Sequence, residues 1–276
     1  SVQQKTRCPN CLKLGKENWK DASLSINLKE NIYNCHKCGW NGKIKTDKET
    51  TMEYKKPELK YMKPLVDKGR EFLLSRGITE EVIDNNKIVS TSDSKGILFP
   101  YFKNGELINY KIRGIDNKSF MQSKDAEPLV YNYDACKGID NIVICEGEMD
   151  SLSWEVAGVK AHTSVNMGAP NVGDKNVDKK LECLNTCYDI FEEAKIIYIA
   201  TDEDENGRNL QKELVRRFGA EKCLLVNLQP FKDANEVLIA EGVDGLKKRI
   251  STSTNPKVEG IFSLSDVKSS MLDGFH

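Results

Sequence analysis

Carboxylates follow two short apolar segments of the chain, and they are the groups best suited to chemistry. The segment 142–145 ends at Glu146, and the segment 196–200 is soon followed by Asp202 and Asp204. Both segments are rich in β-branched residues, which is typical of strands buried on both faces of a parallel sheet. A helix-like stretch follows each one, 151–157 after the first and 206–218 after the second, and a further helix is predicted over 178–193. The two βα units would bring the three carboxylates to one sheet edge if their strands are neighbours.

These acids have the composition of a site for a hard divalent cation. Asp202 and Asp204 are two residues apart, so in extended chain their side chains point the same way. Carboxylate oxygens without histidine or cysteine among them favour Mg²⁺ or Mn²⁺. Asp233 follows a third predicted strand, 223–228, and would join the cluster, although capping of the next helix explains this aspartate nearly as well.

Four of the nine cysteines form two Cys-x-x-Cys pairs, Cys8 with Cys11 and Cys35 with Cys38. Two such pairs predict a zinc ribbon, in which four thiolates surround one structural Zn²⁺ and leave no open coordination position. An odd number of cysteines fits a reducing compartment better than a disulfide framework. His36, inside the second pair, could replace a cysteine as a zinc ligand, but it is rather expected to face solvent or nucleic acid.

Aromatic and basic residues alternate in the same region. Trp19, Tyr33 and Trp40 are interleaved with lysines, a composition suited to stacking on unpaired bases while the lysines meet phosphates. Packing inside the small ribbon explains any one of these rings about equally well. The lysine-rich, polar stretch 44–63 is predicted to be a tether.

The overall composition excludes several classes of protein. The 276 residues are 39% hydrophobic and 30% charged with a net charge of −1, which argues against disorder and for more than one domain. Residues 1–63 nevertheless carry roughly twice as many basic as acidic residues, as expected for a polyanionic partner. No apolar run approaches a membrane span and no signal-peptide core is present, so an intracellular protein without a membrane partner is expected.

Between the tether and the acidic segments, the pattern predicts two helices separated at Gly77, then four short strands. Lys111, Arg113 and Lys118 would lie on an exposed hairpin there, where they suit phosphates of a template or nucleotide; a merely solvated hairpin is the alternative. Farther along, the loop 163–170 contains Gly168, which permits close backbone approach to phosphates.

Three acidic motifs occur in order along the chain: Glu146-Gly147-Glu148-x-Asp150, Asp202-x-Asp204 and Lys232-Asp233-Ala234-Asn235-Glu236. Together they resemble the Toprim catalytic domain. With the preceding zinc ribbon and basic region, the chain resembles the primase part of phage primase-helicases, which are related to bacterial DnaG-type primases and to the mitochondrial helicase Twinkle. The loop around Asn166 and Met167 departs from the family pattern, which has Pro-Asn at these two positions.

The resemblance implies a fold of mixed α/β and α+β class. A small β zinc ribbon would be tethered to an RNA polymerase domain whose first half is α+β and whose second half is a Rossmann-like parallel Toprim sheet. The expected boundaries are 1–43 for the ribbon, 44–63 for the linker, 64–140 for the basic half, 141–251 for Toprim and 252–276 for a linker toward a helicase module.

The resemblance also implies roles for individual residues. Glu146, Asp202, Asp204 and Asp233 correspond to catalytic acids, which would hold two or more Mg²⁺ or Mn²⁺ ions together with Asp150. Nucleotide or template contacts are expected from a second set: Lys111, Arg113, Lys118, Asn166, Gly168, Lys232, and Trp40 and His36 of the ribbon.

The implied activity is synthesis of short RNA primers on single-stranded DNA during replication, by in-line nucleotidyl transfer. The partners would be the DNA template, ribonucleoside triphosphates, the nascent RNA primer, a replicative helicase on the same chain and a replicative DNA polymerase. The setting would be the host cytoplasm during phage infection or an organellar nucleoid. Two alternatives remain: a Toprim nuclease or topoisomerase-like enzyme that cleaves DNA, and a catalytically idle accessory that binds single-stranded DNA.

Overall fold

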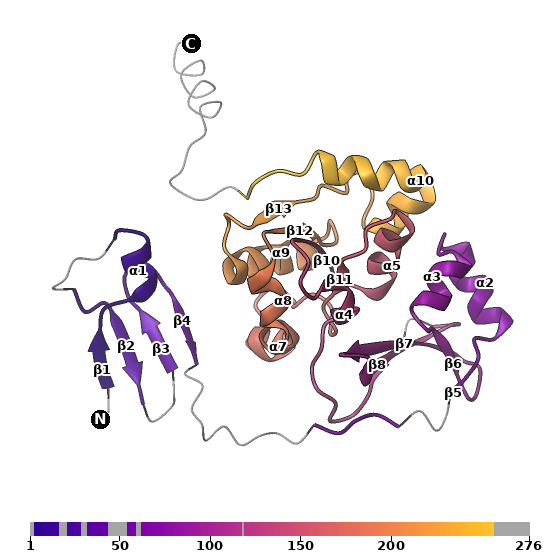
Figure 1. Cartoon of the computed structure of the whole chain (residues 1–276), viewed down its shortest axis with the longest axis horizontal. Coiled ribbons are helices and arrows are strands. Elements are labelled where there is room, and N and C mark those ends of the chain that lie inside the picture. Colours follow the sequence, from indigo (N-terminus) through magenta and orange to yellow (C-terminus); the bar gives the residue numbers. More distant parts are fainter. Residues whose placement is uncertain are drawn as a thin grey trace, which may run out of the picture. The chain divides into compact units, whose positions relative to one another are not determined.

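The protein folds into two compact units, residues 1–53 and 54–276, which are coloured along the chain in Figure 1. The structure, a computed structural model, describes residues 3–16, 21–28, 32–43, 54–58, 62–117 and 119–256. Trp19, Lys118, most of the predicted tether and the stretch 257–276 lie outside these ranges. Within the described residues, no helix has the length and apolar character that a membrane span requires.

The first unit is a four-stranded antiparallel sheet with one short helix, α1 (Pro9–Lys13). Its strands occur in the order β1 (Gln3–Thr6), β2 (Leu24–Asn27), β3 (Ile32–Cys35) and β4 (Asn41–Lys43). The buried core consists of three cysteines and one leucine: Cys8, Cys11, Cys35 and Leu24. So few apolar groups cannot offset the entropy of folding by themselves, and small units of this kind depend on a metal or another crosslink.

The second unit begins with a five-stranded antiparallel sheet, whereas the sequence pattern predicted four strands; the additional strand is β5, at the end of the stretch predicted as a tether. Its strands are β5 (Met62–Lys63), β6 (Val89–Thr91), β7 (Gly96–Lys103), β8 (Glu106–Gly114) and β9 (Phe120–Gln122). Two helices, α2 (Asp67–Ser75) and α3 (Glu80–Asn85), precede β6 and are separated at Gly77, whose φ of +76° suits glycine. The Thr79 hydroxyl caps α3 by accepting the Val82 N–H.

A second sheet in this unit is fully parallel, with strand order β11-β10-β12-β13. The strands are β10 (Asn141–Cys145), β11 (His162–Ser164), β12 (Ile196–Ala200) and β13 (Cys223–Leu225). Cys145 is in register with both Ser164 and Ala200, so three neighbouring strands end level with one another. This confirms the predicted α/β class and the adjacency of the two acidic strands.

Helices surround the parallel strands (Figure 1). They are α4 (Tyr133–Cys136), α5 (Glu148–Val156), α6 (Val177–Lys180), α7 (Glu182–Thr186), α8 (Tyr188–Glu193), α9 (Glu205–Phe218) and α10 (Ala234–Ser251). One continuous core includes residues of both sheets, for example Phe99 of β7 and Ile199 of β12. The proposed boundaries at 43, 63, 140 and 251 stay predictions.

Three sequence predictions are corrected here. The single helix expected over 178–193 is instead three short helices, because the backbone leaves helical geometry at Leu181 and Cys187, both of which are fully buried. Strand β13 ends at Leu225 rather than at residue 228. Helix α5 begins at Glu148, three residues earlier than expected, so Glu148 and Asp150 lie in its first turn. Acidic residues there are favoured by the helix dipole.

Candidate active site

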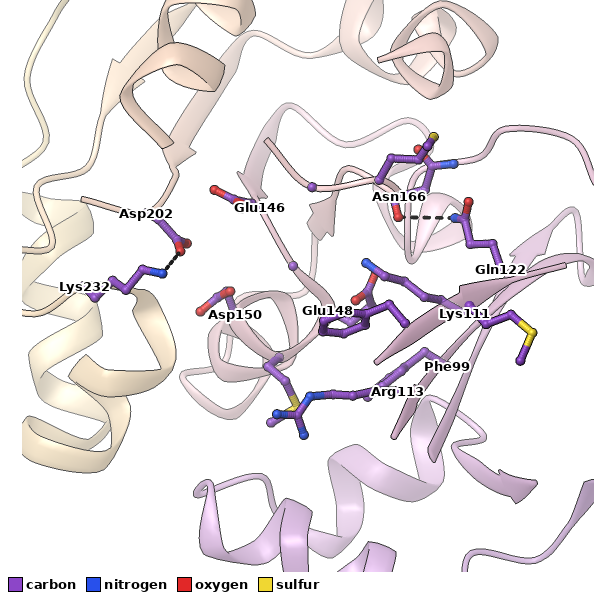
Figure 2. A pocket seen from close by; sticks show the side chains of 16 residues that line it. Phe99, Lys111, Arg113, Gln122, Glu146, Glu148, Asp150, Asn166, Asp202 and Lys232 are labelled. Carbon is purple, nitrogen blue, oxygen red and sulfur yellow. Dashed lines mark hydrogen bonds and ion pairs between the residues drawn. The ribbon is translucent and has the colours of Figure 1, made fainter. Parts of the chain in front are cut away.

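The level ends of β10, β11 and β12 place Glu146, Asn166 and Asp202 around one pocket of about 530 Å³. The facing wall comes from the antiparallel sheet and includes Lys111 and Arg113 of β8. Figure 2 shows the carboxylates on one side of this pocket and the amide side chains of Gln122 and Asn166 on the other. A cavity of this size and mixed polarity is typical of a small-ligand site.

Lys232 joins two of the predicted catalytic acids. Its ammonium lies 3.2 Å from Asp202 Oδ2 and 3.1 Å from Asp204 Oδ2, so these two carboxylates point the same way, as their spacing predicted. Asp204 also caps α9 by accepting the Gly207 N–H at 2.9 Å. A side chain on Gly207 would place its Cβ 2.0 Å from the Asp202 carbonyl oxygen. Glycine is therefore required for the helix to begin this close to the acids.

Burial and mutual repulsion oppose ionisation of the acids inside the pocket. Burial, with the Glu146 charge in addition, raises the pKa of Asp202 to about 7. Burial likewise raises the pKa of Glu146, and burial together with Asp233 and Asp202 raises that of Asp150. By contrast, the N–H of Gly207 lowers the pKa of Asp204. A cation between these groups would relieve the repulsion and favour their ionised forms.

The residues present fit a divalent metal. Glu146 Oε2 is buried and has no hydrogen-bond partner among the described residues, which leaves an oxygen ready to ligate. However, within the described ranges only the cysteines form a group of three or more candidate ligands whose ligand atoms all lie within 4.8 Å of one another. The carboxylates are spaced more widely, so their joint ligation of one ion stays a prediction.

Asp233 lies at the beginning of α10. Like Asp204, it does not belong to the residues that line the pocket. Its carboxylate caps α10 by accepting the Glu236 N–H at 2.8 Å, and the Glu236 side chain accepts the Lys232 N–H at 2.8 Å. Capping of this helix is the alternative that the sequence left open. The Asp233 charge still contributes to the raised pKa of Asp150.

The raised pKa of Asp202 predicts an unusual pH dependence of stability. Between pH about 4 and about 7 the folded protein holds a proton that the unfolded chain has released, so the metal-free protein should lose stability as pH rises. From pH 5 to 8 we expect the wild type to lose about 2 kcal/mol more than Asp202→Asn. Urea unfolding without metal measures this difference. Identical pH profiles for the two proteins would contradict it.

Lys111 and Arg113 do not lie on an exposed hairpin turn, which corrects the sequence interpretation. Both belong to β8, and Lys111 is only 9% exposed because its ammonium donates to buried Glu148 at 3.0 Å. The Tyr101 hydroxyl donates to the same Glu148 oxygen at 2.5 Å. The Arg113 guanidinium lies over the Phe72 ring, 4.3 Å from its centre, and burial lowers its pKa. The two sheets are thus connected through buried charges beside the pocket.

Loss of Glu148 should therefore destabilise the second unit strongly. Glu148→Gln leaves the Lys111 ammonium buried without a counter-charge, which is expected to cost about 3 kcal/mol. Glu106→Gln is the matched control, because Glu106 pairs with Lys56 at the surface and its loss should change stability by less than about 1 kcal/mol. Urea unfolding of both variants at pH 7 checks the prediction, which fails if the two costs are equal.

Several residues around the pocket were not assigned a role from the sequence. Asn235 is fully buried, and its backbone N–H donates to Asp150 Oδ1 at 3.2 Å while its amide donates to the Arg76 carbonyl at 2.8 Å. Asn235 and Glu148 both belong to the acidic motifs named above, and this position in the motifs could have identified them as site residues. Gln122, which lines the pocket, and Tyr101, which donates to Glu148, carry no such signal, because only the packing of the sheets brings them there.

The loop after β11 wraps around Glu146. The Ala169 backbone lowers the pKa of Glu146, against the larger effect of burial, and Gly168, with a φ of +67°, approaches so closely that a Cβ there would lie 3.7 Å from Glu146 Oε1. The Asn166 carbonyl accepts a hydrogen bond from Gln122 Nε2 at 3.3 Å, which is drawn in Figure 2. Asn166 and Gly168 therefore lie in the pocket wall, while Lys118 lies outside the described residues.

The four cysteines of the first unit converge as the zinc-ribbon spacing predicted. The Sγ atoms of Cys8 and Cys38 are 3.7 Å apart, and those of Cys11 and Cys35 are 3.6 Å apart. A tetrahedron of thiolates around Zn²⁺ has edges of about 3.8 Å, given a Zn–S distance of about 2.3 Å. The Cys11 N–H and the Asn10 amide donate to sulfur atoms of the cluster. The arrangement fits a structural zinc ion.

The other predicted ribbon residues are at the surface of the first unit. His36 is exposed, and its Nε2 pairs with the Ser25 hydroxyl at 2.9 Å rather than with the cysteine cluster. Trp40 is 37% exposed, and its ring centre lies 4.4 Å from that of Tyr33. Each ring therefore packs on the other while part of Trp40 remains open to a ligand.

Comparisons with known proteins agree with this geometry. Residues 143–238 match the family described as Toprim-like. The chain is 32% identical to the Twinkle homolog protein, chloroplastic/mitochondrial, of Arabidopsis thaliana, over 94% of this chain and 40% of that protein. It is 32% identical to the Primase homolog protein of the same plant, over 88% of this chain and 79% of that protein.

Among solved structures, the primase fragment of the bacteriophage T7 primase-helicase protein matches with a TM-score of 0.54 at 20% identity, covering 90% of this chain and 98% of that fragment. This similarity shows that the two chains share a fold.

An acidic pocket at the carboxyl edge of a parallel sheet, facing a basic antiparallel sheet, defines a Toprim catalytic core. The chain belongs to the family of Toprim primase homologs that includes these two plant proteins, as its motifs predicted. It spans less than half of the Twinkle homolog that it matches.

Proposed function

We propose that this chain synthesises short RNA primers on single-stranded DNA by nucleotidyl transfer. The observation that carries the proposal is the single pocket that combines Glu146 and Asp202 with Lys111, Arg113 and Lys232. Carboxylates and cations in one cavity suit a triphosphate bound together with divalent metal. Family membership makes primer synthesis the reaction that fits this site best.

Different side chains bind the triphosphate, hold the metal and transfer the proton. Lys111 and Arg113 bind triphosphate oxygens from the antiparallel sheet, and Lys232 does so from the acidic side. Asp202 and Asp204, with Asp150 and Asp233 in support, would hold Mg²⁺ or Mn²⁺, which supplies charge stabilisation for in-line attack at the α-phosphorus. Glu146, whose pKa is raised by burial, either completes this site or accepts the proton of the attacking 3′-hydroxyl.

The zinc unit would read the DNA template. Partly exposed Trp40 and exposed His36 offer stacking and hydrogen-bonding groups for unpaired bases. A replicative helicase on the same full-length chain and a DNA polymerase are the further partners that the family resemblance supports. The chloroplastic and mitochondrial designation of one relative supports an organellar nucleoid as one setting for this activity.

A primer-synthesis assay tests the proposal. The protein is incubated with ribonucleoside triphosphates, magnesium or manganese, and random single-stranded DNA templates, and the products are sized. Short oligoribonucleotides that require the template are expected. Cleavage of the DNA without nucleotides would favour the nuclease alternative, and DNA binding without any product would favour an accessory role.

A further inference from the structure

Asn166 has a buried side-chain atom with no hydrogen-bond partner in the part of the chain that the structure describes. The residue is 4% exposed, and this atom is its Oδ1. The backbone is held in place, because the carbonyl accepts a hydrogen bond from Gln122 Nε2 at 3.3 Å. Since buried polar atoms are nearly always paired in folded proteins, this oxygen is positioned to accept a hydrogen bond from a ligand.

The side chain stands where two cavities meet. Asn166, Gln122 and Met167 line both the active-site pocket and a second cavity of about 550 Å³. The second cavity is otherwise lined largely by polar groups, including Asn109, Ser123, Asn176 and Lys179. Asn166 is therefore within reach of a ligand in either cavity.

The distance between Glu146 and Asn166 is suited to the sugar of a nucleotide. Gly168 lies against Glu146 Oε1, and Asn166 is two residues before it, which in extended chain is at most about 7 Å. Figure 2 shows Asp202 and Lys232 on the side of the pocket opposite the two amides, with Lys111 between them. A nucleotide whose phosphates lie beside Asp202 and Lys232 would place its sugar, the next group along, toward the amides.

We propose that Asn166 Oδ1 accepts a hydrogen bond from the 2′-hydroxyl of the incoming nucleotide and so selects ribonucleotides over deoxyribonucleotides. The inference rests on the proposed function, because it places the triphosphate at the acids. The 2′-hydroxyl is the donor that distinguishes the two classes of sugar. A site that hydrogen-bonds a substrate hydroxyl discriminates against a substrate without that hydroxyl, because the buried acceptor is then left without a hydrogen-bond partner.

Asn166→Ala tests this assignment through binding and through turnover. Affinities for ATP and 2′-deoxy-ATP are measured by competition in the presence of magnesium, and kcat/KM is measured for incorporation of each. The ribonucleotide preference is expected to fall about 10- to 100-fold. Asn171→Ala is the matched control, because Asn171 lies on the same loop with an exposed side chain. The ribonucleotide preference of this variant should equal that of the wild type.

A second variant distinguishes loss of the acceptor oxygen from a general disturbance of the loop structure. Asn166→Asp keeps an acceptor oxygen in place and should retain the preference, because its added charge affects both nucleotides equally. An unchanged ratio in Asn166→Ala, loss of the ratio in Asn166→Asp, no ribose preference in the wild type, or a change among bases rather than sugars would each overturn the assignment. Absence of primer synthesis by the wild type would overturn the proposed function, while the binding ratio still tests Asn166.

Discussion

Replacing Asp202 by asparagine is expected to lower the rate of primer synthesis at least about a hundredfold. Asp202 is the pocket carboxylate at the end of β12, and it is paired with Lys232 at 3.2 Å. Asparagine has nearly the same shape but no charge, so the site loses attraction for the divalent cation without losing volume. The measurement is the initial rate of oligoribonucleotide formation on single-stranded DNA across a range of magnesium concentrations.

The control for this prediction is Asp244→Asn, which removes an exposed carboxylate on α10 and should leave the rate unchanged. Raised magnesium should restore the Asp202 variant only partly, because the missing ligand limits the rate even at saturation. Thermal melting should show that the variant is folded and, above pH 7 without metal, at least as stable as the wild type. A fully active Asp202→Asn protein would remove this carboxylate from the catalytic set.

Loss of zinc is expected to unfold the first unit and leave the second intact. Among the described residues of the first unit, the buried core contains only Leu24 besides three of the cysteines, so the metal supplies most of the folding free energy, about 10 kcal/mol or more. Cys35→Ser, or a strong chelator, should abolish the circular dichroism and NMR signals of residues 3–43. Template-directed initiation should fall sharply, while nucleotide binding at Asp202 persists.

His36→Ala is the matched control for the zinc prediction. His36 stands between two of the ligands but is exposed and pairs with Ser25, so its loss should leave one zinc ion per chain by metal analysis. If this variant retains zinc but loses template selection, the turn between Cys35 and Cys38 has a direct role in reading DNA. If Cys35→Ser leaves the primer start sites unchanged, the template-reading role of the ribbon is wrong.

Much of the candidate site could be predicted because it depends on local sequence patterns. Two Cys-x-x-Cys pairs bring four thiolates together through their own tight turns, and the structure places them 3.6 to 3.7 Å apart in pairs. Apolar β-branched runs ending at Glu146 and before Asp202 indicated parallel strands whose ends meet. The same reasoning failed for Lys111, because a basic residue in a polar stretch gives no sign of a buried partner 37 residues away.

The sequence by itself determined the zinc ribbon, the parallel sheet and the set of acids at its carboxyl edge, because short-range spacing and strand periodicity are properties of neighbouring residues. Only the tertiary structure decided that Glu148 meets Lys111 and that Lys232 lies between Asp202 and Asp204. It also decided that Asn166 Oδ1, which has no hydrogen-bond partner among the described residues, belongs to a residue that lines two cavities. These contacts join residues far apart in the chain, and their geometry follows from how the two sheets pack on one core.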